Sequence, residues 1–240
     1  MRVKRIGKRL AMTDRKTKEP QNQSQIDDYN QHGGVTFGPW TSHIWRTDPR
    51  HLSFLMSRYK FISKMLAGRK KGLEIGCGDA AGTPIILQTV DSVYAVDFEP
   101  LVLNDAKERY RKAREDRVRF AVHDMVQGSV EESGFDSAYS LDVIEHIPQE
   151  HEDAFMRNIV SSLDEHAVCI IGTPNIAAEA YSSPGSKAGH INLKSAESLK
   201  ALMERSFHNV FNFSMNDEVV HTGYSPMSHY LFSMGVGVKV

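Results

Sequence analysis

Cysteine and long apolar runs are both scarce in this sequence. Its 240 residues include two cysteines, Cys77 and Cys169, too few for a disulfide framework and placed too far apart for a CxxC metal pair. No apolar run approaches the roughly 18 residues of a membrane span, and the N-terminus lacks the apolar stretch of a signal peptide. These absences predict a soluble, cytoplasmic protein without a membrane partner.

An excess of charge of one sign is also missing. The chain has 29 Lys and Arg against 30 Asp and Glu, which disfavours a protein that binds nucleic acid over its whole surface. A hydrophobic fraction of 40% and a charged fraction of 25% are typical of a globular chain with a sizeable core. The exception is residues 1–20, a basic segment that we expect to be a flexible arm, with phosphate binding as the alternative.

The next segment, residues 21–68, is predicted to be an N-terminal lid and helix. It begins polar and turn-rich but carries Trp40 and Trp45, which need an apolar surface to dock on. From Pro49, apolar residues recur at three- and four-residue steps until Gly68 supplies a stop. We therefore divide the chain into the arm, this lid, and a ligand-binding domain over residues 69–240. The part of the lid from Tyr29 to Trp45 is expected to close over the ligand.

Residues 69–240 alternate between short apolar runs and helical segments. The predicted strands are Gly72–Gly76, Ser92–Val96, Arg117–Val122, Phe135–Leu141, Ala167–Gly172, Asn209–Phe213 and Tyr230–Met234. The predicted helices are Thr83–Gln88, Pro100–Arg114, Gln149–Leu163 and a helix capped by Ser195 that runs to Arg205. Strands separated by helices predict a doubly wound α/β fold with a mostly parallel sheet, closed by an antiparallel pair of strands.

A glycine turn follows the first of these strands. Gly76 and Gly78 let the backbone turn tightly and approach a ligand, and Asp97 ends the next strand 21 residues after Gly76. A carboxylate at that position is suited to accept both hydroxyls of a ribose. The pattern therefore predicts a nucleoside-containing cofactor. Gly76-x-Gly78-x-x-Ala81 can be aligned with the dinucleotide fingerprint, so NAD is one alternative.

Three further features favour S-adenosylmethionine (SAM) over NAD. Glu74 precedes the glycines within the strand, where it is suited to orient the loop and the amino group of the methionine. Asp124, just past the third strand, is suited to accept an adenine amino hydrogen. The segment Ser140–Pro148 follows the fourth strand and holds two acids and a histidine.

Five ordered motifs resemble those of class I SAM-dependent methyltransferases. They read LEIGCGDA, AVDFEP, AVHDM, FDSAYSLDVIEHIP and CIIGTPN, and they are most similar to the branch related to ubiquinone-biosynthesis O-methyltransferases and small-molecule tailoring enzymes. The resemblance covers roughly residues 58–235 and implies a seven-stranded Rossmann-like methyltransferase fold with a helical lid.

By this resemblance, Gly76, Cys77 and Gly78 would wrap the methionine portion of SAM, and Asp97 would hold the ribose. Arg58, which precedes the first strand, would meet the carboxylate of the cofactor. One departure from the family is Ala80, which replaces the third glycine of the loop.

The same resemblance assigns the adenine and sulfonium contacts. Phe98 would flank the adenine, and Asp124 and Met125 would bracket its edge. Ser140 and Leu141 would contact the sulfonium side.

The predicted activity is methylation of a small-molecule hydroxyl, such as that of a sugar or phenol. Removing the hydroxyl proton calls for a base, and His146 and His190 are the candidates because neutral histidine is suited to pH 7. Alternatives are an RNA or protein methyltransferase, suggested by the basic arm, and a SAM-binding partner subunit without catalysis. The identity of the acceptor and the oligomeric state carry no sequence signal.

A metal site is a further alternative. Asp142, Glu145, His146 and His190 resemble the acid and histidine group that binds a divalent ion in some relatives, among them small-RNA 2′-O-methyltransferases. An Mg²⁺ or Mn²⁺ ion there would lower the pKa of an acceptor hydroxyl and replace a base. The competing interpretation is that Glu145 and His146 brace the helix that follows.

Overall fold

The computed structural model describes residues 16–113 and 115–239, which fall into two compact units divided between Thr36 and Phe37. The smaller unit contains a 3-10 turn, Pro20–Asn22, and helix α1, Gln23–His32, none of whose residues is buried. The predicted basic arm lies outside the described residues except for its last five positions. Across the described residues, none of the helices is both long enough and apolar enough to cross a membrane.

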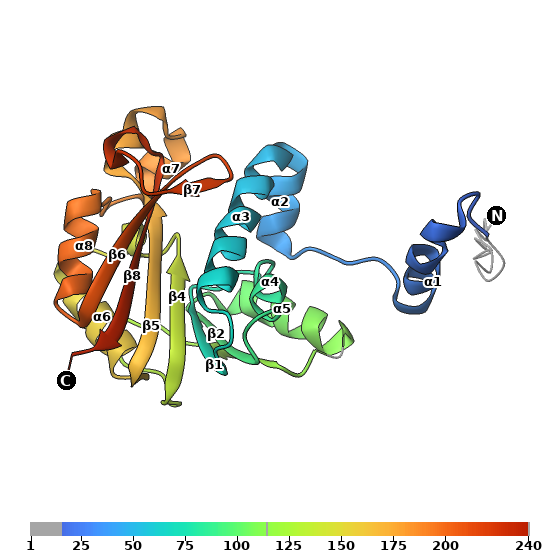
Figure 1. Ribbon diagram of the computed structural model, residues 1–240, viewed down its shortest axis with the longest axis horizontal. Coiled ribbons are helices and arrows are strands. Elements are labelled where there is room, and N and C mark those ends of the chain that lie inside the picture. Colours follow the sequence, from blue (N-terminus) through green and yellow to red (C-terminus); the bar gives the residue numbers. More distant parts are fainter. Residues whose placement is uncertain (1–15, 114, 240) are drawn as a thin grey trace, which may run out of the picture. The chain divides into compact units, whose positions relative to one another are not determined.

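The larger unit is built on one mixed sheet (Figure 1). Its eight strands follow the order β3-β2-β1-β4-β5-β8-β6-β7. Strands β1 to β5 are parallel, and β8 runs antiparallel to both of its neighbours, β5 and β6. The strands are β1 Lys71–Ile75, β2 Ser92–Asp97, β3 Val118–Val122, β4 Phe135–Leu141, β5 Leu163–Pro174, β6 Phe207–Asn216, β7 Val219–His221 and β8 Tyr230–Val238.

Helices precede the sheet and separate successive parallel strands, except for β3 and β4, which a loop connects. They are α2 Pro39–Thr47, α3 Pro49–Met65, α4 Thr83–Ile86, α5 Pro100–Ala113, α6 Glu152–Val160, α7 Pro184–Gly189 and α8 Ala196–Glu204. Five 3-10 turns complete the described elements, and the larger unit holds Ile144–His146, Gln149–His151, Ile176–Tyr181 and Ser225–Met227. The starts of α3 and α8 have the expected capping chemistry, because Asp48 accepts from the amide of His51 and Ser195 forms a capping box with Ser198.

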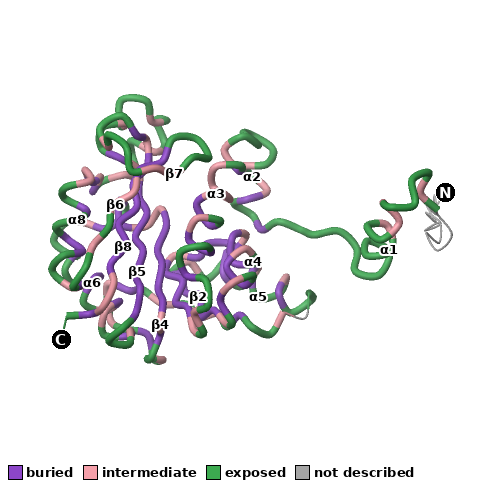
Figure 2. The backbone as a smooth tube through the Cα atoms, in the orientation of Figure 1, coloured by how far each residue is buried: buried purple, intermediate pink, exposed green. Residues whose placement is uncertain are grey.

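The sheet is buried on both faces, so the core has two layers (Figure 2). Alternation along β4 separates the layers, because Tyr139 packs in one cluster and its neighbour Ala138 in the other. The first cluster includes Ile62 of α3 and Leu103 of α5, whereas the second includes residues of α6 and α8. Strands covered on both sides are expected of a doubly wound fold.

The predicted α/β fold, with its mostly parallel sheet and terminal antiparallel pair, is confirmed, but two details were wrong. The sheet has eight strands rather than seven. Strand β6 continues to Asn216, turns through Asp217 at φ 48°, and returns as the short β7. The helix predicted over Gln149–Leu163 ends at Val160, because the hydroxyls of Ser161 and Ser162 donate to the carbonyl of Asn158. Leu163 therefore begins β5.

Candidate functional site

The sequence-predicted site residues lie at the carboxyl ends of the parallel strands, where strand order reverses. From β1 the chain runs outward through β2 to β3 at one edge of the sheet, and it then crosses back to β4 on the other side of β1. Such a switch point forms the ligand crevice of open α/β sheets. Figure 1 shows α2, the start of α3, α7 and β7 gathered at this end of the sheet.

The glycine loop after β1 has the backbone that the sequence predicts. Gly76 and Gly78 have φ values of 74° and 54°, in the region that side chains disfavour. A Cβ on Gly76 would lie 2.2 Å from Cγ2 of Val143, and one on Gly78 would lie 2.8 Å from Cζ3 of Trp40. Ala80 adopts φ 54° as well, and its carbonyl accepts a hydrogen bond from Tyr110 at 2.7 Å, so alanine in place of the third glycine keeps the turn.

Asp97 connects this loop to the end of β2. Its carboxylate accepts from the amide of Gly78 at 2.8 Å and from the amide of Glu99 at 2.9 Å, and the residue is buried. Each carboxylate oxygen retains a second lone pair for a ligand hydroxyl. The neighbouring Phe98 is 72% exposed, so its ring is uncovered beside the loop. Asp97 and Phe98 therefore stand where the sequence places a ribose and an adenine.

Glu74 lies beneath the loop and is fully buried. One carboxylate oxygen accepts from the hydroxyl of Thr83 at 2.7 Å, and within the described residues the other has no hydrogen-bond partner. Burial raises the pKa of Glu74 to about 7, although the hydroxyls of Thr83 and Tyr139 oppose the shift. Its contacts join β1 to the start of α4, so it braces the loop from below.

The residues after β3 occupy the adjoining rim. Asp124 is exposed and accepts from the amide of Val126 at 2.9 Å, while Met125 is buried. The carbonyl of Met125 accepts from the amide group of Asn158 at 2.8 Å, which fixes this turn to α6.

Arg58 of α3 crosses to the end of β4. Its guanidinium donates to Asp142 at 2.6 Å and stacks over the ring of Tyr230, with 3.8 Å between the guanidinium carbon and the ring centroid. Burial lowers the pKa of Arg58, but the Asp142 carboxylate more than offsets this and raises it overall. Nε of Arg58 is buried without a partner among the described residues. The two β4 residues predicted to contact the sulfonium side, Ser140 and Leu141, are buried just before this pair.

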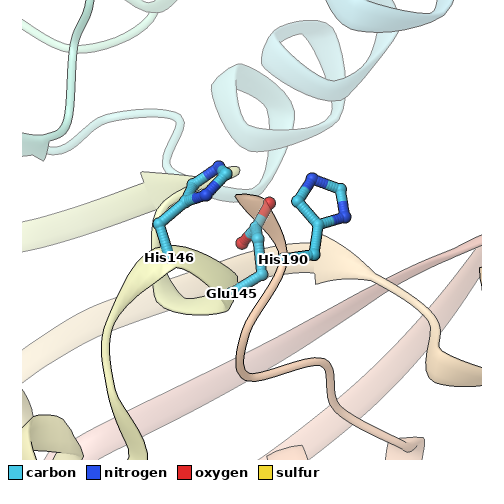
Figure 3. A group of neighbouring side chains, drawn as sticks. All are labelled: Glu145, His146 and His190. Atoms are coloured by element: carbon cyan, nitrogen blue, oxygen red, sulfur yellow. The ribbon is translucent and has the colours of Figure 1, made fainter. Parts of the chain in front are cut away.

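The two predicted catalytic residues, His146 and His190, meet Glu145, a predicted metal ligand, beyond the end of β4 (Figure 3). The ligand atoms of Glu145, His146 and His190 all lie within 4.8 Å of one another. The rings of His146 and His190 are 5.1 Å apart, and Nδ1 of His146 lies 2.9 Å from the carbonyl oxygen of Gly189. Asp142, the fourth predicted metal ligand, is instead paired with Arg58.

Two atoms of this cluster have no partner. In the described part of the chain, Oε1 of Glu145 and Nδ1 of His190 are buried without hydrogen bonds, while Oε2 of Glu145 accepts from Thr173 at 3.0 Å. Burial, followed by the charge of Asp142, raises the pKa of Glu145. Burial and the neighbouring His146 lower the pKa of His190. His190 is therefore neutral near pH 7, with a ring nitrogen available as a base.

Two further histidines lie near Arg58. The ring of His51 packs on Phe54 with centroids 4.6 Å apart, and His229 meets the same ring edge-on at 6.0 Å. Burial and the charge of Arg58 lower the pKa of both histidines. The sequence reasoning did not single out His51, which stands in the first turn of a helix like any surface residue.

A buried polar network fixes the segment that carries His190. Lys194 donates to Glu152 and, at 2.9 Å, to Asn192, and Asn192 donates to Glu152 at 2.7 Å. Asn175, at the end of β5, donates to the carbonyl of Ser228 at 2.9 Å. Asn175 belongs to the motif CIIGTPN, but the motif gave no indication that it joins these loops.

Comparisons with known proteins bear on the family and the fold. Residues 73–166 match the family described as a methyltransferase domain. A comparison with curated proteins returned no match.

Several solved structures share the fold. The N-methyltransferase NodS from Bradyrhizobium japonicum WM9, in complex with S-adenosyl-L-homocysteine, is 20% identical with a TM-score of 0.60, covering 80% of this chain and 91% of that chain. The methyltransferase domain of bacterial CtHen1 is 18% identical with a TM-score of 0.64, covering 77% of this chain and 99% of that chain. A SAM-dependent methyltransferase from Clostridium acetobutylicum ATCC 824 is 12% identical with a TM-score of 0.64, covering 82% of this chain and 98% of that chain.

The structural likenesses confirm the predicted Rossmann-like methyltransferase fold, and the family match lies within it, over residues 73–166. The predicted enzyme class, a SAM-dependent methyltransferase, agrees with both findings. The ubiquinone-related branch and the acceptor remain predictions.

Proposed function

We propose that this chain transfers the methyl group of SAM to a hydroxyl of a small molecule. The cofactor would be held by the glycine loop, by Asp97 and by Phe98. The fit rests on the buried Asp97, because each of its carboxylate oxygens accepts one backbone amide and keeps a second lone pair for a ligand hydroxyl beside the glycine turn. When bound, SAM supplies an electrophilic methyl group on a good leaving group. The chain itself has to position the acceptor and remove its proton.

The observation that carries the hydroxyl acceptor is the cluster of Glu145, His146 and His190. A hydroxyl must lose its proton during transfer, and a neutral imidazole is matched to that task near pH 7. His190 has a lowered pKa and an unpartnered Nδ1 among the described residues. His146 is exposed and is held through Nδ1 by Gly189, which leaves Nε2 free to face an acceptor. We assign the base to His190 or His146.

Charge on the loops beside this cluster favours a small molecule over RNA. In residues 175–194 and 216–229, all of them described, Lys187 is the one exposed Lys or Arg. Three exposed acids, Glu179, Asp217 and Glu218, lie on the same two loops. A phosphate backbone is bound through clustered Lys and Arg, so this rim would repel it. The small-RNA relatives therefore serve as a structural likeness and not as a guide to the acceptor.

A divalent ion is the second candidate for activating the hydroxyl. Glu145, His146 and His190 offer three ligand atoms close together, a set suited to Mn²⁺ or Mg²⁺ when water completes the shell. Asp142 would have to leave Arg58 to join them. The base is favoured because Asp142 is engaged by Arg58, which leaves Glu145 as the one carboxylate of the cluster for an ion that prefers oxygen ligands.

The test is a methyl-transfer assay on paired acceptors, each pair presenting a hydroxyl or an amine on the same apolar or sugar scaffold. We expect S-adenosylhomocysteine to form with the hydroxyl member and the rate to be unchanged by a chelator. Turnover of amines alone would contradict O-methylation. Loss of activity with chelator, restored by Mn²⁺ or Mg²⁺, would replace the base with a metal. Binding of SAM without turnover of any acceptor would favour the non-catalytic subunit.

A further inference from the structure

One contact of the glycine loop reaches outward, to the first helix of the larger unit. The six-membered ring of Trp40 lies over Gly78, where an added Cβ would meet Cζ3 at 2.8 Å and Cε3 at 2.9 Å. On its other side, Gly78 donates its amide to Asp97. Gly78 therefore contacts both Asp97, the proposed ribose-binding acid, and Trp40.

Trp40 is held there by Asp79, the next residue of the loop. The Asp79 carboxylate accepts from the amide of Thr41 at 2.8 Å and from its hydroxyl at 2.8 Å. Thr41 stands in the first turn of α2, whose free amide groups and helix dipole favour an acceptor of negative charge. Asp79 and Thr41 are 4% and 2% exposed, so this bidentate contact is shielded from water. The loop thus caps the helix that carries Trp40.

The rest of the junction is built for close approach. A Cβ on Gly38 would lie 2.4 Å from Cβ of Asp79 and 2.6 Å from a nitrogen of Arg109. Arg109 of α5 donates to the Asp79 carbonyl and, at 2.7 Å, to Asp105. Pro39 begins α2 directly after Gly38. Glycine at position 38 lets the helix start seat against the loop.

Trp40 is nevertheless only half covered. Its exposed fraction is 49%, although one edge lies on a buried loop. Phe98, at the end of the neighbouring strand, is exposed as well. Two large aromatic surfaces thus remain uncovered, one resting on Gly78 and one next in sequence to Asp97. Aromatic faces of this size gain free energy when a ligand covers them.

We propose that Trp40 is a cofactor-contacting residue, and that Asp79 is the positioning residue that holds it over the glycine loop through Thr41. Trp40 forms the outer wall of the site, opposite the sheet, and bound SAM covers its free face. This inference rests on the proposed function, since it takes the occupant of the loop to be SAM. It goes beyond that function by assigning Trp40 of α2 to the cofactor site and the Asp79–Thr41 contact to its positioning.

The chain has two tryptophans, so one substitution makes Trp40 a specific reporter. In the full chain carrying Trp45→Phe, titration with S-adenosylhomocysteine should change the Trp40 emission, with the same Kd as calorimetry gives. Trp40→Leu should raise that Kd about 10-fold, since a large aromatic contact is lost. Circular dichroism and the Tm verify that each variant is folded.

Positioning by Asp79 is tested with a graded series. Thr41→Ser keeps both donors and should bind as the parent does. Thr41→Val loses the hydroxyl bond only, and Asp79→Asn weakens both bonds, so Kd for S-adenosylhomocysteine should rise in that order. Asp79→Asn should also shift the Trp40 emission of the free chain to longer wavelength and raise KM for SAM with kcat little changed.

The outcomes separate this inference from the proposed function. If the parent chain does not bind S-adenosylhomocysteine, both are overturned. If it binds, but Trp40→Leu binds equally well or the Trp40 emission does not respond, only the inference is overturned. If Trp40→Leu weakens binding while Thr41→Val and Asp79→Asn leave Kd unchanged, Trp40 stays as a contact and the positioning role of Asp79 is rejected.

Discussion

The two sides of the strand-end crevice are constructed differently. On the cofactor side, comprising residues 76–80 and 97–98, recognition depends on the backbone and on one buried acid. On the acceptor side, comprising Glu145, His146 and His190, it depends on side chains brought from two separate connections. The cofactor side is fixed by glycines and short loops, whereas the acceptor side is fixed by a polar network of loops after β5 and before β8.

This difference bears on how each side is expected to vary. A backbone site tolerates few residues, because any Cβ at Gly76 would collide with Val143. A side-chain site tolerates many, because loops of other length or sequence can present other groups. Under the proposed function, the cofactor side therefore sets the reaction class, and the acceptor side sets what is methylated. The predictions below test whether the two sides are separable.

The largest expected effect is on turnover. His190→Ala and His146→Ala each remove one candidate base. The variant that lacks the residue acting as the base should have a kcat roughly 10²–10⁴-fold below that of the parent. Calorimetry should give both variants the parental Kd for S-adenosylhomocysteine. His208→Ala, an exposed histidine on β6, is the matched control and should leave both quantities unchanged. Loss of cofactor affinity in either active-site variant would break the separation of the two sides.

Gly76→Ala should have the next largest effect, on cofactor affinity. The added Cβ meets Val143 at 2.2 Å and forces a side chain into φ 74°. Backbone strain and overpacking each cost about 1–3 kcal/mol, so Kd for S-adenosylhomocysteine should rise on the order of 100-fold. Adding Val143→Ala should relieve the collision but not the strain, and recover only part of the affinity. If Val143→Ala restored the parental Kd in full, the positive φ at position 76 would contribute nothing to the loss of affinity.

Asp97→Asn should have a smaller effect of the same kind. An amide offers one acceptor oxygen in place of two, so the amide of Gly78 or that of Glu99 loses its partner. A buried unsatisfied group costs about 1–3 kcal/mol, which predicts at least about a 5-fold rise in Kd for S-adenosylhomocysteine. Asp91→Asn, on an exposed turn, serves as the control. An unchanged Kd for Asp97→Asn would remove this acid from the cofactor side.

The smallest expected effect is a pH dependence of stability from Glu74. Its pKa is about 7 in the folded chain and near the ordinary glutamate value of 4.5 when the chain is unfolded. The folded state therefore keeps a proton that the unfolded state releases, and the contribution to stability is lost as pH rises from 4.5 through 7. The free energy of unfolding of the parent should fall relative to that of Glu74→Gln, by at most about 1.4 kcal/mol per pH unit. Parallel pH profiles in urea denaturation would contradict this.

The same contrast explains what the sequence could predict. The glycine loop, Asp97 and the order of strands are local signals, since each depends on residue types at short spacing. The helix predicted over Gln149–Leu163 was given the wrong end because its apolar periodicity continues into β5, where Leu163 pairs with Phe135. Strand β7 was missed because three residues are too few to show alternation.

The side-chain contacts of the site were harder to predict. His146 and His190 were expected at the acceptor side and meet there. The pairing of Arg58 with Asp142 joins residues 84 positions apart, and that of Asp79 with Thr41 joins residues 38 apart. No local pattern indicates such partners, because they are determined by how α2 and α3 pack on the sheet. Long-range pairs of this kind account for most of what the sequence left open.

The central claim is that the cofactor side binds SAM and does so independently of the acceptor side. The most direct test is calorimetric titration of the full chain and of the His146→Ala, His190→Ala double variant with S-adenosylhomocysteine and, separately, with NAD. We expect one molecule of S-adenosylhomocysteine per chain with the same Kd in both proteins, and no heat from NAD. Binding of NAD without a response to S-adenosylhomocysteine would contradict the claim.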